Sequence, residues 1–205
     1  MSLDDQVAII TGATRGIGKA LALRLADLGV RVCVTGKTVE PGGELPGTIH
    51  QTAEEIEELG GEALPLKLNV REEEECKSVI EETVETWGRL DILINNAGAI
   101  QLTSVEETPP NRFDLLMEVN ARGAYVCSHY AIPHMRDSGG GHILMASPPV
   151  ASDSSPGKTA YGLSKIGMTY IAKSLAAELR DDNIAANAFW PLTAIDTRAT
   201  RYFNL

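Results

Sequence analysis

A tyrosine and a lysine late in the chain have the residue types and the spacing for proton transfer. Tyr161 and Lys165 stand four residues apart in YGLSK, within a segment expected to be helical, so their side chains share one helix face. A free tyrosine has a pKa near 10, which is too high for efficient proton transfer at neutral pH. A lysine ammonium one helical turn away favours the phenolate. Tyr161 is therefore the candidate acid in a reduction and the candidate base in an oxidation. An ordinary helical pair is the alternative.

A glycine-rich turn near the N-terminus supplies the other half of a hydride-transfer site. The apolar run Val7–Ile10 leads into the pattern T-G-x-x-x-G-x-G, which contains Gly12, Gly16 and Gly18. Glycines allow the dihedral angles of a tight turn and the close approach of a phosphate, and the start of the following helix attracts that phosphate. Because the motif follows a strand and opens a helix, a dinucleotide site is favoured over a simple turn.

Short apolar runs alternate with helical patterns, as in a parallel sheet covered on both faces. The predicted strands are Val7–Ile10, Val30–Val34, Ala63–Leu68, Leu90–Ile94, His142–Ala146 and Ile184–Phe189. The predicted helices are Gly18–Leu28, Thr52–Leu59, Glu72–Trp87, Asn111–Arg136 and Thr159–Arg180. The segment Glu40–His50 is expected to be a loop because of its glycines and prolines. We therefore predict a single domain over residues 1–205, an α/β fold with a doubly wound parallel sheet of the Rossmann type.

The composition narrows the class of partner. The net charge is −10 and the pI is about 4.9, which disfavours nucleic acid as a partner. The sequence shows neither a run of about 18 apolar residues, as a membrane span requires, nor a signal-peptide pattern. Three scattered cysteines, Cys33, Cys76 and Cys127, indicate buried thiols and a reducing, cytoplasmic compartment. His129 and His134 are five residues apart, which is the wrong spacing for two ligands on one helix face, so no metal site is expected.

Four motifs, in this order along the chain, resemble those of the short-chain dehydrogenase/reductase family. They are TGATRGIG at 11–18, NNAG at 95–98, Asn120 in MEVNARG, and YGLSK at 161–165. A closer likeness to the hydroxysteroid-dehydrogenase-like subgroup lies in the stretches at 47–66, 146–149 and 187–197. The resemblance implies an oxidoreductase that interconverts a small-molecule carbonyl and an alcohol. A 3-oxoacyl-thioester reductase and a non-catalytic dinucleotide-binding sensor or scaffold are the alternatives.

The resemblance also implies a catalytic set of Asn120, Ser147, Tyr161 and Lys165. In the family, Asn120 helps to hold a water in a proton relay, Ser147 meets the substrate carbonyl, and Lys165 binds the nicotinamide ribose as well. Ser147 stands one residue further from Tyr161 than is usual. We expect the loop 148–158 to carry the extra residue, because Ser147 directly follows a predicted strand at the edge of the sheet where ligands bind.

The cofactor is predicted to be NADP(H). The second strand ends without the carboxylate that binds the ribose hydroxyls of NAD, and Lys37 and Arg15 are cations suited to a 2′-phosphate. Solvated surface charges are the alternative interpretation of these two side chains. By resemblance, Asn69 and Val70 approach the adenine, while Ile195 and Thr197 contact the carboxamide and the phosphates. The predicted cofactor contacts are Gly12, Thr14, Arg15, Gly16, Ile17, Gly18, Lys37, Asn69, Val70, Asn96, Ala97, Gly98, Tyr161, Lys165, Pro191, Ile195 and Thr197.

Two further expectations concern the C-terminus and assembly. Family members usually continue through a substrate-covering helix pair and a seventh strand, so that strand is expected to be missing from a sequence that stops at Leu205. The resemblance and the predicted helices 111–136 and 159–180 indicate a homo-oligomer, a dimer or a tetramer. Small residues would let these helices approach their copies closely, unless they pack on the chain's own sheet; they are Ala121, Gly123, Ala124, Gly167 and Ala172.

Overall fold

Six parallel strands form one sheet in the order β3-β2-β1-β4-β5-β6. The computed structural model describes residues 3–42, 45–148, 156–191, 195 and 201. The strands are β1 (Val7–Ile10), β2 (Arg31–Gly36), β3 (Ala63–Lys67), β4 (Ile92–Asn95), β5 (Gly141–Ala146) and β6 (Ile184–Phe189). This is the predicted doubly wound fold, and its topological switch point lies between β1 and β4. β6 is an edge strand, and the described part of the chain contains no seventh strand.

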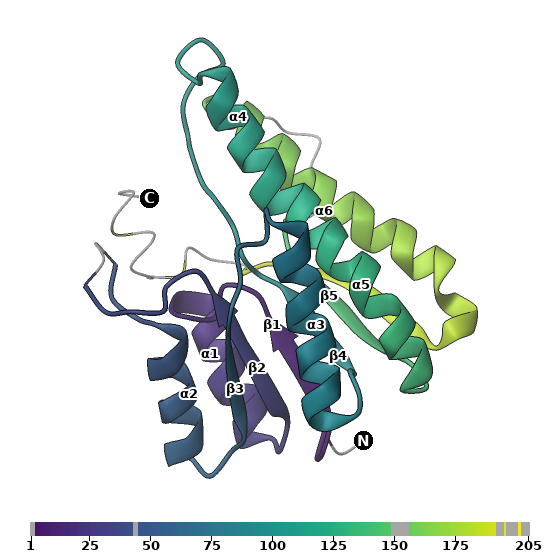
Figure 1. Ribbon diagram of the computed structural model, residues 1–205. Helices are drawn as coiled ribbons and strands as arrows, with labels where there is room; N and C mark the ends of the chain where they lie inside the picture. The colour runs from purple at the N-terminus through teal and green to yellow at the C-terminus, as the bar shows by residue number, and fades with distance from the viewer. Residues whose placement is uncertain (1–2, 43–44, 149–155, 192–194, 196–200, 202–205) are drawn as a thin grey trace.

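Helices cover both faces of the sheet (Figure 1). Successive side chains of a strand point to opposite faces. Accordingly, Ala8 and Ile10 pack with α1 and α2, whereas Val7 and Ile9 pack with α3, α5 and α6. Burial on both faces explains why the strands appear in the sequence as continuous apolar runs. The main helices are α1 (Gly16–Asp27), α2 (Ile49–Glu58), α3 (Glu73–Trp87), α4 (Pro110–Leu116), α5 (Gly123–Asp137) and α6 (Thr159–Glu178).

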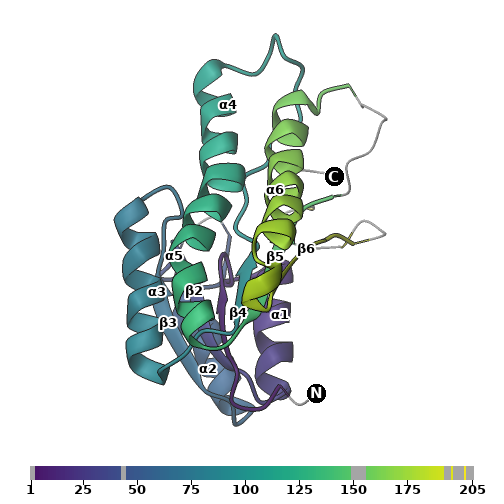
Figure 2. The ribbon, with the colours of Figure 1, turned by 90° about the vertical axis from the view of Figure 1, so that its right-hand side faces the viewer.

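The helix predicted over Asn111–Arg136 is not uniformly α-helical. A π-helix, η1 (Met117–Arg122), separates α4 from α5, and Figure 2 shows the three as one rod beside α6. Gly123, where α5 begins, packs so tightly that a Cβ would lie 2.8 Å from Cγ2 of Val70. Apolar periodicity does not reveal such a local change of winding, which is frequent at functional sites.

Helix α2 begins at Ile49 rather than at the predicted Thr52, so the loop expected over 40–50 ends at Thr48. A capping box sets this start. The Thr48 hydroxyl accepts a hydrogen bond from the Gln51 N–H at 3.0 Å, and Gln51 Oε1 accepts one from the Thr48 N–H at 3.2 Å. The glycines and prolines before Thr48 obscured this signal in the sequence.

The cysteines agree with the prediction made from the sequence. All three cysteines are buried free thiols, as predicted.

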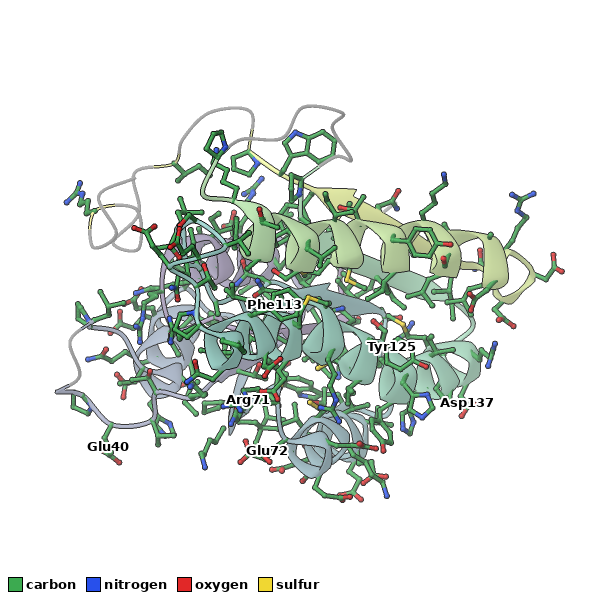
Figure 3. The ribbon with its side chains drawn as sticks, turned by 90° about the horizontal axis from the view of Figure 1, so that it is seen from above. Glu40, Arg71, Glu72, Phe113, Tyr125 and Asp137 are labelled. Atoms are coloured by element: carbon green, nitrogen blue, oxygen red, sulfur yellow. The ribbon has the colours of Figure 1, made fainter. Side chains whose placement is uncertain are left out.

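Helix α3 begins with three carboxylates in its first turn, which complement the positive end of the helix dipole. Arg71 joins this region to η1 through an ion pair with Glu118 at 2.7 Å, and Figure 3 shows it between α3 and the α4–α5 rod. None of the helices in the described residues is long and apolar enough to cross a membrane.

The small residues proposed for contacts between copies instead pack within the chain. Gly123, Ala124 and Ala172 are buried, and a Cβ on Gly167 would lie 3.2 Å from that of Ala121. Ala121 and Gly167 let η1 and α6 approach each other. The expectation that Gly123, Ala124 and Ala172 face a second copy is wrong, because they are buried within the chain. The exposed large hydrophobic side chains of α5 and α6 are Tyr125, Leu163, Ile166 and Tyr170, and Tyr125 is labelled in Figure 3.

Candidate active site

Hydrogen bonds join the loops that follow β1 and β4. The Thr11 hydroxyl accepts from the backbone N–H groups of Asn96 and Ala97, both at 2.9 Å. The side-chain amide of Asn96 donates to the carbonyl oxygens of Thr11 and Gly12 at 3.0 and 3.1 Å. Asn96, a predicted cofactor contact, therefore also holds the glycine-rich turn in place. Thr11 was not among the predicted site residues, although it stands directly before Gly12 in the motif.

The glycines of the turn have little room for a side chain. Gly12 has a φ of +69°, and a Cβ there would lie 2.9 Å from Cα of Ala97. A Cβ on Gly18 would lie 2.3 Å from the Gly12 carbonyl oxygen. Both residues must be glycine because the NNAG segment and helix α1 pack directly on the turn.

A cavity of about 550 Å³ lies at the carboxyl ends of the strands. Its walls come from the segments after β1, β2, β3 and β4, together with α4 and η1. Ligands of open α/β sheets bind at this position. The lining includes twelve predicted cofactor contacts: Gly12, Thr14, Arg15, Gly16, Ile17, Gly18, Lys37, Asn69, Val70, Asn96, Ala97 and Gly98.

The two cations predicted to select NADP(H) differ in how they are held. Arg15 Nη2 donates to Thr38 Oγ1 at 2.9 Å and to the Gly47 carbonyl at 3.2 Å. Gly47 has a φ of +108°, and a Cβ there would lie 2.3 Å from the Thr14 carbonyl oxygen. Lys37 is exposed, and no hydrogen bond or ion pair to another described residue holds its ammonium. Arg15 is thus the fixed cation of the pair.

Asn120 connects the cavity to helix α6. It is fully buried, its Oδ1 accepts from the Ala99 N–H at 2.8 Å, and its Nδ2 donates to the Ala99 carbonyl at 3.0 Å. The same Nδ2 donates to Ser164 Oγ at 2.8 Å, and Ser164 Oγ donates to the Tyr161 carbonyl at 2.7 Å. The prediction overlooked Ser164, although it stands next to Lys165 in YGLSK.

Lys165 lies where the cavity meets this network. Its Nζ donates to the Ala146 carbonyl at the end of β5 at 2.8 Å. A Cβ on Gly98, which lines the cavity, would lie 3.5 Å from Lys165 Nζ and 3.4 Å from Asn120 Oδ1. The structure therefore brings two predicted catalytic residues, Asn120 and Lys165, to one end of the predicted cofactor cavity.

Ser147 directly follows β5, as predicted, but its side chain is 2% exposed. Its backbone N–H donates to the Phe189 carbonyl at 3.0 Å, and its hydroxyl contacts Thr169 Oγ1 at 3.0 Å. Thr169 was not predicted, although it stands four residues after Lys165 on the same helix face. Most of the loop predicted to carry the extra residue, 149–155, lies outside the described residues.

The remaining predicted contacts come from the end of the chain. Pro191 is exposed. Ile195 lines a neighbouring cavity of about 630 Å³ that shares Thr14–Ile17 with the first. Thr197 lies outside the described residues.

A family model described as short chain dehydrogenase matches residues 6–204. The chain belongs to the short-chain dehydrogenase family. The family comprises oxidoreductases that bind nicotinamide dinucleotides. Hydroxysteroid dehydrogenase-like protein 2 of Danio rerio is 46% identical to this short-chain dehydrogenase over 192 residues, which are 93% of the chain and 46% of the relative. The chain thus spans about half the length of that relative.

Solved structures of other short-chain dehydrogenases share the fold, and they include a complex with NADP and a complex with NADH. A metagenomic short-chain oxidoreductase in complex with NADP is 30% identical with a TM-score of 0.86, over 95% of this chain and 85% of that one. A 7α-hydroxysteroid dehydrogenase complexed with NADH and 7-oxo glycochenodeoxycholic acid is 30% identical with a TM-score of 0.89, over 98% of this chain and 75% of that one. Membership of the family therefore does not decide between NADP and NAD.

Burial alters the proton affinities of the Tyr–Lys pair in this short-chain dehydrogenase. It lowers the pKa of Lys165 to about 8, because the buried ammonium loses its hydration. It raises the pKa of Tyr161, because burial disfavours the phenolate. The expectation that the pKa of Tyr161 is lowered is thus wrong for the chain by itself. The Lys165 Nζ donates a hydrogen bond to the Ala146 carbonyl, and loss of hydration is the main effect on the pKa of Tyr161.

Proposed function

We propose that this chain is an NADP(H)-dependent oxidoreductase that interconverts a carbonyl and an alcohol, with Tyr161 as the proton-transferring group. The observation that carries the proposal is the meeting of Asn120 and Lys165 with Gly98 at one end of the cavity. When bound, a nicotinamide dinucleotide supplies or accepts the hydride. The protein contributes position, a proton and electrostatics.

The cavity fits a dinucleotide along its length. At one end, the glycine-rich turn and the first residues of helix α1 line the cavity, and the N-terminus of a helix attracts a phosphate. Near the predicted adenine end, the Asn69 N–H donates to Glu75 Oε2 at 2.6 Å, and Asn69 Oδ1 accepts from the Arg71 N–H at 3.4 Å. These contacts, with a 3.4 Å bond from Asn69 Nδ2 to Glu72 Oε1, hold the loop that follows β3 where it lines the cavity.

The preference for NADP(H) is supported by the residues that follow β2. Gly36, Lys37 and Thr38 provide no carboxylate for the ribose hydroxyls. Arg15 is held beside them by Thr38 and Gly47, and a guanidinium binds phosphate in a fixed geometry. Among the described residues that line this end there are two cations and no acid, which favours a ligand with a 2′-phosphate.

The protonation states favour reduction near neutral pH. With its pKa raised by burial, Tyr161 is a neutral phenol that can donate a proton to a developing alkoxide. Below about pH 8, Lys165 carries a positive charge one helical turn away. Asn120 and Ser164 fix the backbone of Tyr161 relative to the loop after β4. We also propose a cytoplasmic location, since the three buried thiols suit a reducing compartment.

A non-catalytic dinucleotide-binding sensor is the second candidate. It is favoured by the burial of Ser147, the residue expected to meet the substrate. A 3-oxoacyl-thioester reductase remains a candidate within the enzyme proposal, because the described cavity does not select one carbonyl class.

The test follows the fluorescence of bound NADPH and its decay when carbonyl compounds are added, among them 3-oxoacyl thioesters and oxosteroids. We expect binding, and decay with at least one compound. Tyr161→Phe should retain NADPH binding and stability, while turnover falls by roughly 10²–10⁴, the usual contribution of general acid–base catalysis. Binding without decay across the panel favours the sensor. Failure to bind either dinucleotide overturns both candidates.

A further inference from the structure

The helix face that carries Tyr161 and Lys165 continues to Thr169. Residues four apart on a helix share a face, and Thr169 stands four residues after Lys165 in α6. Lys165 Nζ contacts the Ala146 carbonyl at 2.8 Å. Thr169 Oγ1 contacts the Pro148 carbonyl at 2.5 Å and Ser147 Oγ at 3.0 Å. Two successive turns of α6 therefore hold three successive residues at the end of β5.

The Thr169 hydroxyl is directed away from its own helix. A threonine inside a helix commonly bonds the carbonyl four residues earlier, as Thr83 and Thr86 do in α3 at 2.7 and 2.8 Å. The corresponding distance from Thr169 Oγ1 to the Lys165 carbonyl is 3.5 Å, the longest of its contacts. Its shorter contacts are with the chain that leaves β5.

This contact controls where the Ser147 hydroxyl lies. Serine has three staggered rotamers, and the bond to Thr169 stabilises one of them. A hydroxyl carries a single proton, so Thr169 donates to only one of its two neighbours at a time. When Thr169 donates to Ser147 Oγ, the proton of Ser147 remains free to bond a substrate carbonyl.

We propose that Thr169 is a positioning residue that fixes the Ser147 hydroxyl for the carbonyl oxygen of a substrate, and that its contact with the Pro148 carbonyl holds the backbone beside that hydroxyl. This rests on the proposed function, in which Ser147 orients the substrate. Thr169 makes the link between the helix that carries the proton donor and the serine that meets the same substrate atom. The relative placement of Tyr161 and Ser147 then follows from one helix face.

The test replaces only the hydroxyl. Thr169→Val keeps the branched shape, and we expect kcat to fall by roughly 10- to 100-fold, the effect of a misplaced orienting group. NADPH affinity should stay unchanged, and Thr169→Ser should restore kcat. Thr86→Val is the matched control, because the Thr86 hydroxyl bonds the Glu82 carbonyl of its own helix, on the exposed side of α3. An unchanged kcat in Thr169→Val, or no rescue by serine, overturns the proposal.

A double-mutant cycle separates positioning from general damage to the fold. If Thr169 acts through Ser147, then Thr169→Val should not lower kcat further in the Ser147→Ala background. Additive losses would show that Thr169 supports the structure without acting through Ser147.

A second readout does not require a substrate. Hydrogen exchange at the Ser147 amide should be faster in Thr169→Val than in the unmodified chain, and unchanged in Thr169→Ser and Thr86→Val. If the chain binds NADPH but reduces no carbonyl, the proposed function fails. The exchange rates then test by themselves whether Thr169 holds Ser147 in place. Equal exchange in all four proteins overturns the inference.

Discussion

Asn96 and Thr11 hold each other through both backbone and side chain. The Asn96 amide donates to the Thr11 carbonyl at 3.0 Å, and the Thr11 hydroxyl accepts from the Asn96 N–H at 2.9 Å. The two residues follow β1 and β4, the strands on either side of the switch point. The glycine-rich turn and the NNAG segment therefore form one unit, and a disturbance of either should reach the other.

A substitution at Gly18 tests how tightly the glycine-rich turn and the NNAG segment are packed. A Cβ at Gly18 would lie 2.3 Å from the Gly12 carbonyl oxygen and 2.5 Å from Asn96 Nδ2. We expect Gly18→Ala to lower the free energy of unfolding by about 1–3 kcal/mol and to weaken NADPH binding. Gly162→Ala is the helical control, since a Cβ there meets no atom of a described residue within 4 Å. It should raise stability by about 0.5–1 kcal/mol. Urea unfolding compares the two, and equal stability would contradict the packing argument.

The lowered pKa of Lys165 predicts that the free energy of unfolding depends on pH. Its pKa is about 8 in the folded chain against an ordinary value of 10.5, so the unfolded chain binds more protons between these limits. The free energy of unfolding contributed by Lys165 therefore rises with pH over this window. The cost of the buried ammonium is fully present below pH 8 and relieved above pH 10.5. The change is on the order of 3 kcal/mol.

Lys165→Met removes this titration and isolates it from other groups. Urea unfolding of both proteins at pH 7 and pH 10 should show the unmodified chain gaining stability relative to the variant at the higher pH. A difference between the two proteins that does not change with pH would show that Lys165 is not buried as a charged group. The variant should also weaken NADPH binding through loss of the proposed ribose contact.

The cofactor preference is tested by binding. We expect NADPH to bind more tightly than NADH, because Arg15 and Lys37 line the cavity beside the end of β2 and none of the described lining residues is an acid. Lys37→Asp should shift the ratio of dissociation constants toward NADH by at least several-fold. Lys77→Asp makes the same change of charge on α3, where Lys77 faces Glu81 at 3.9 Å, and should leave the ratio unchanged. Equal affinities in the unmodified chain would defeat the proposal.

Assembly is tested on the exposed face of α5 and α6. Tyr125 and Tyr170 are 59% and 68% exposed, and large exposed apolar side chains that gather on one surface mark contact sites. We expect a homo-oligomer in sedimentation at micromolar concentration, and we expect Tyr170→Glu to dissociate it. Leu59→Glu changes an equally exposed residue at the end of α2 and should have no effect. A monomer at every concentration tested would rule out this assembly.

The sequence alone determined the features that depend on neighbouring residues. The six strands were predicted because parallel strands buried on both faces are continuous apolar runs. The glycine-rich turn and the pairing of Tyr161 with Lys165 follow from spacing along one loop and one helix. The start of α2 could also have been predicted, because Thr48 and Gln51 have the spacing of a capping box.

Only the tertiary structure decided the contacts between distant segments. Thr11 and Asn96 are 85 residues apart, Asn120 and Ser164 are 44, and Ser147 and Thr169 are 22. Spacing along the chain says nothing about such distances, so the sequence did not indicate that the Ser147 hydroxyl is bonded to Thr169. For the same reason, the small residues of η1 and α6 were assigned to a partner copy. Burial likewise set the pKa of Tyr161, because desolvation depends on everything that packs around a group and not on its nearest charged neighbour in the sequence.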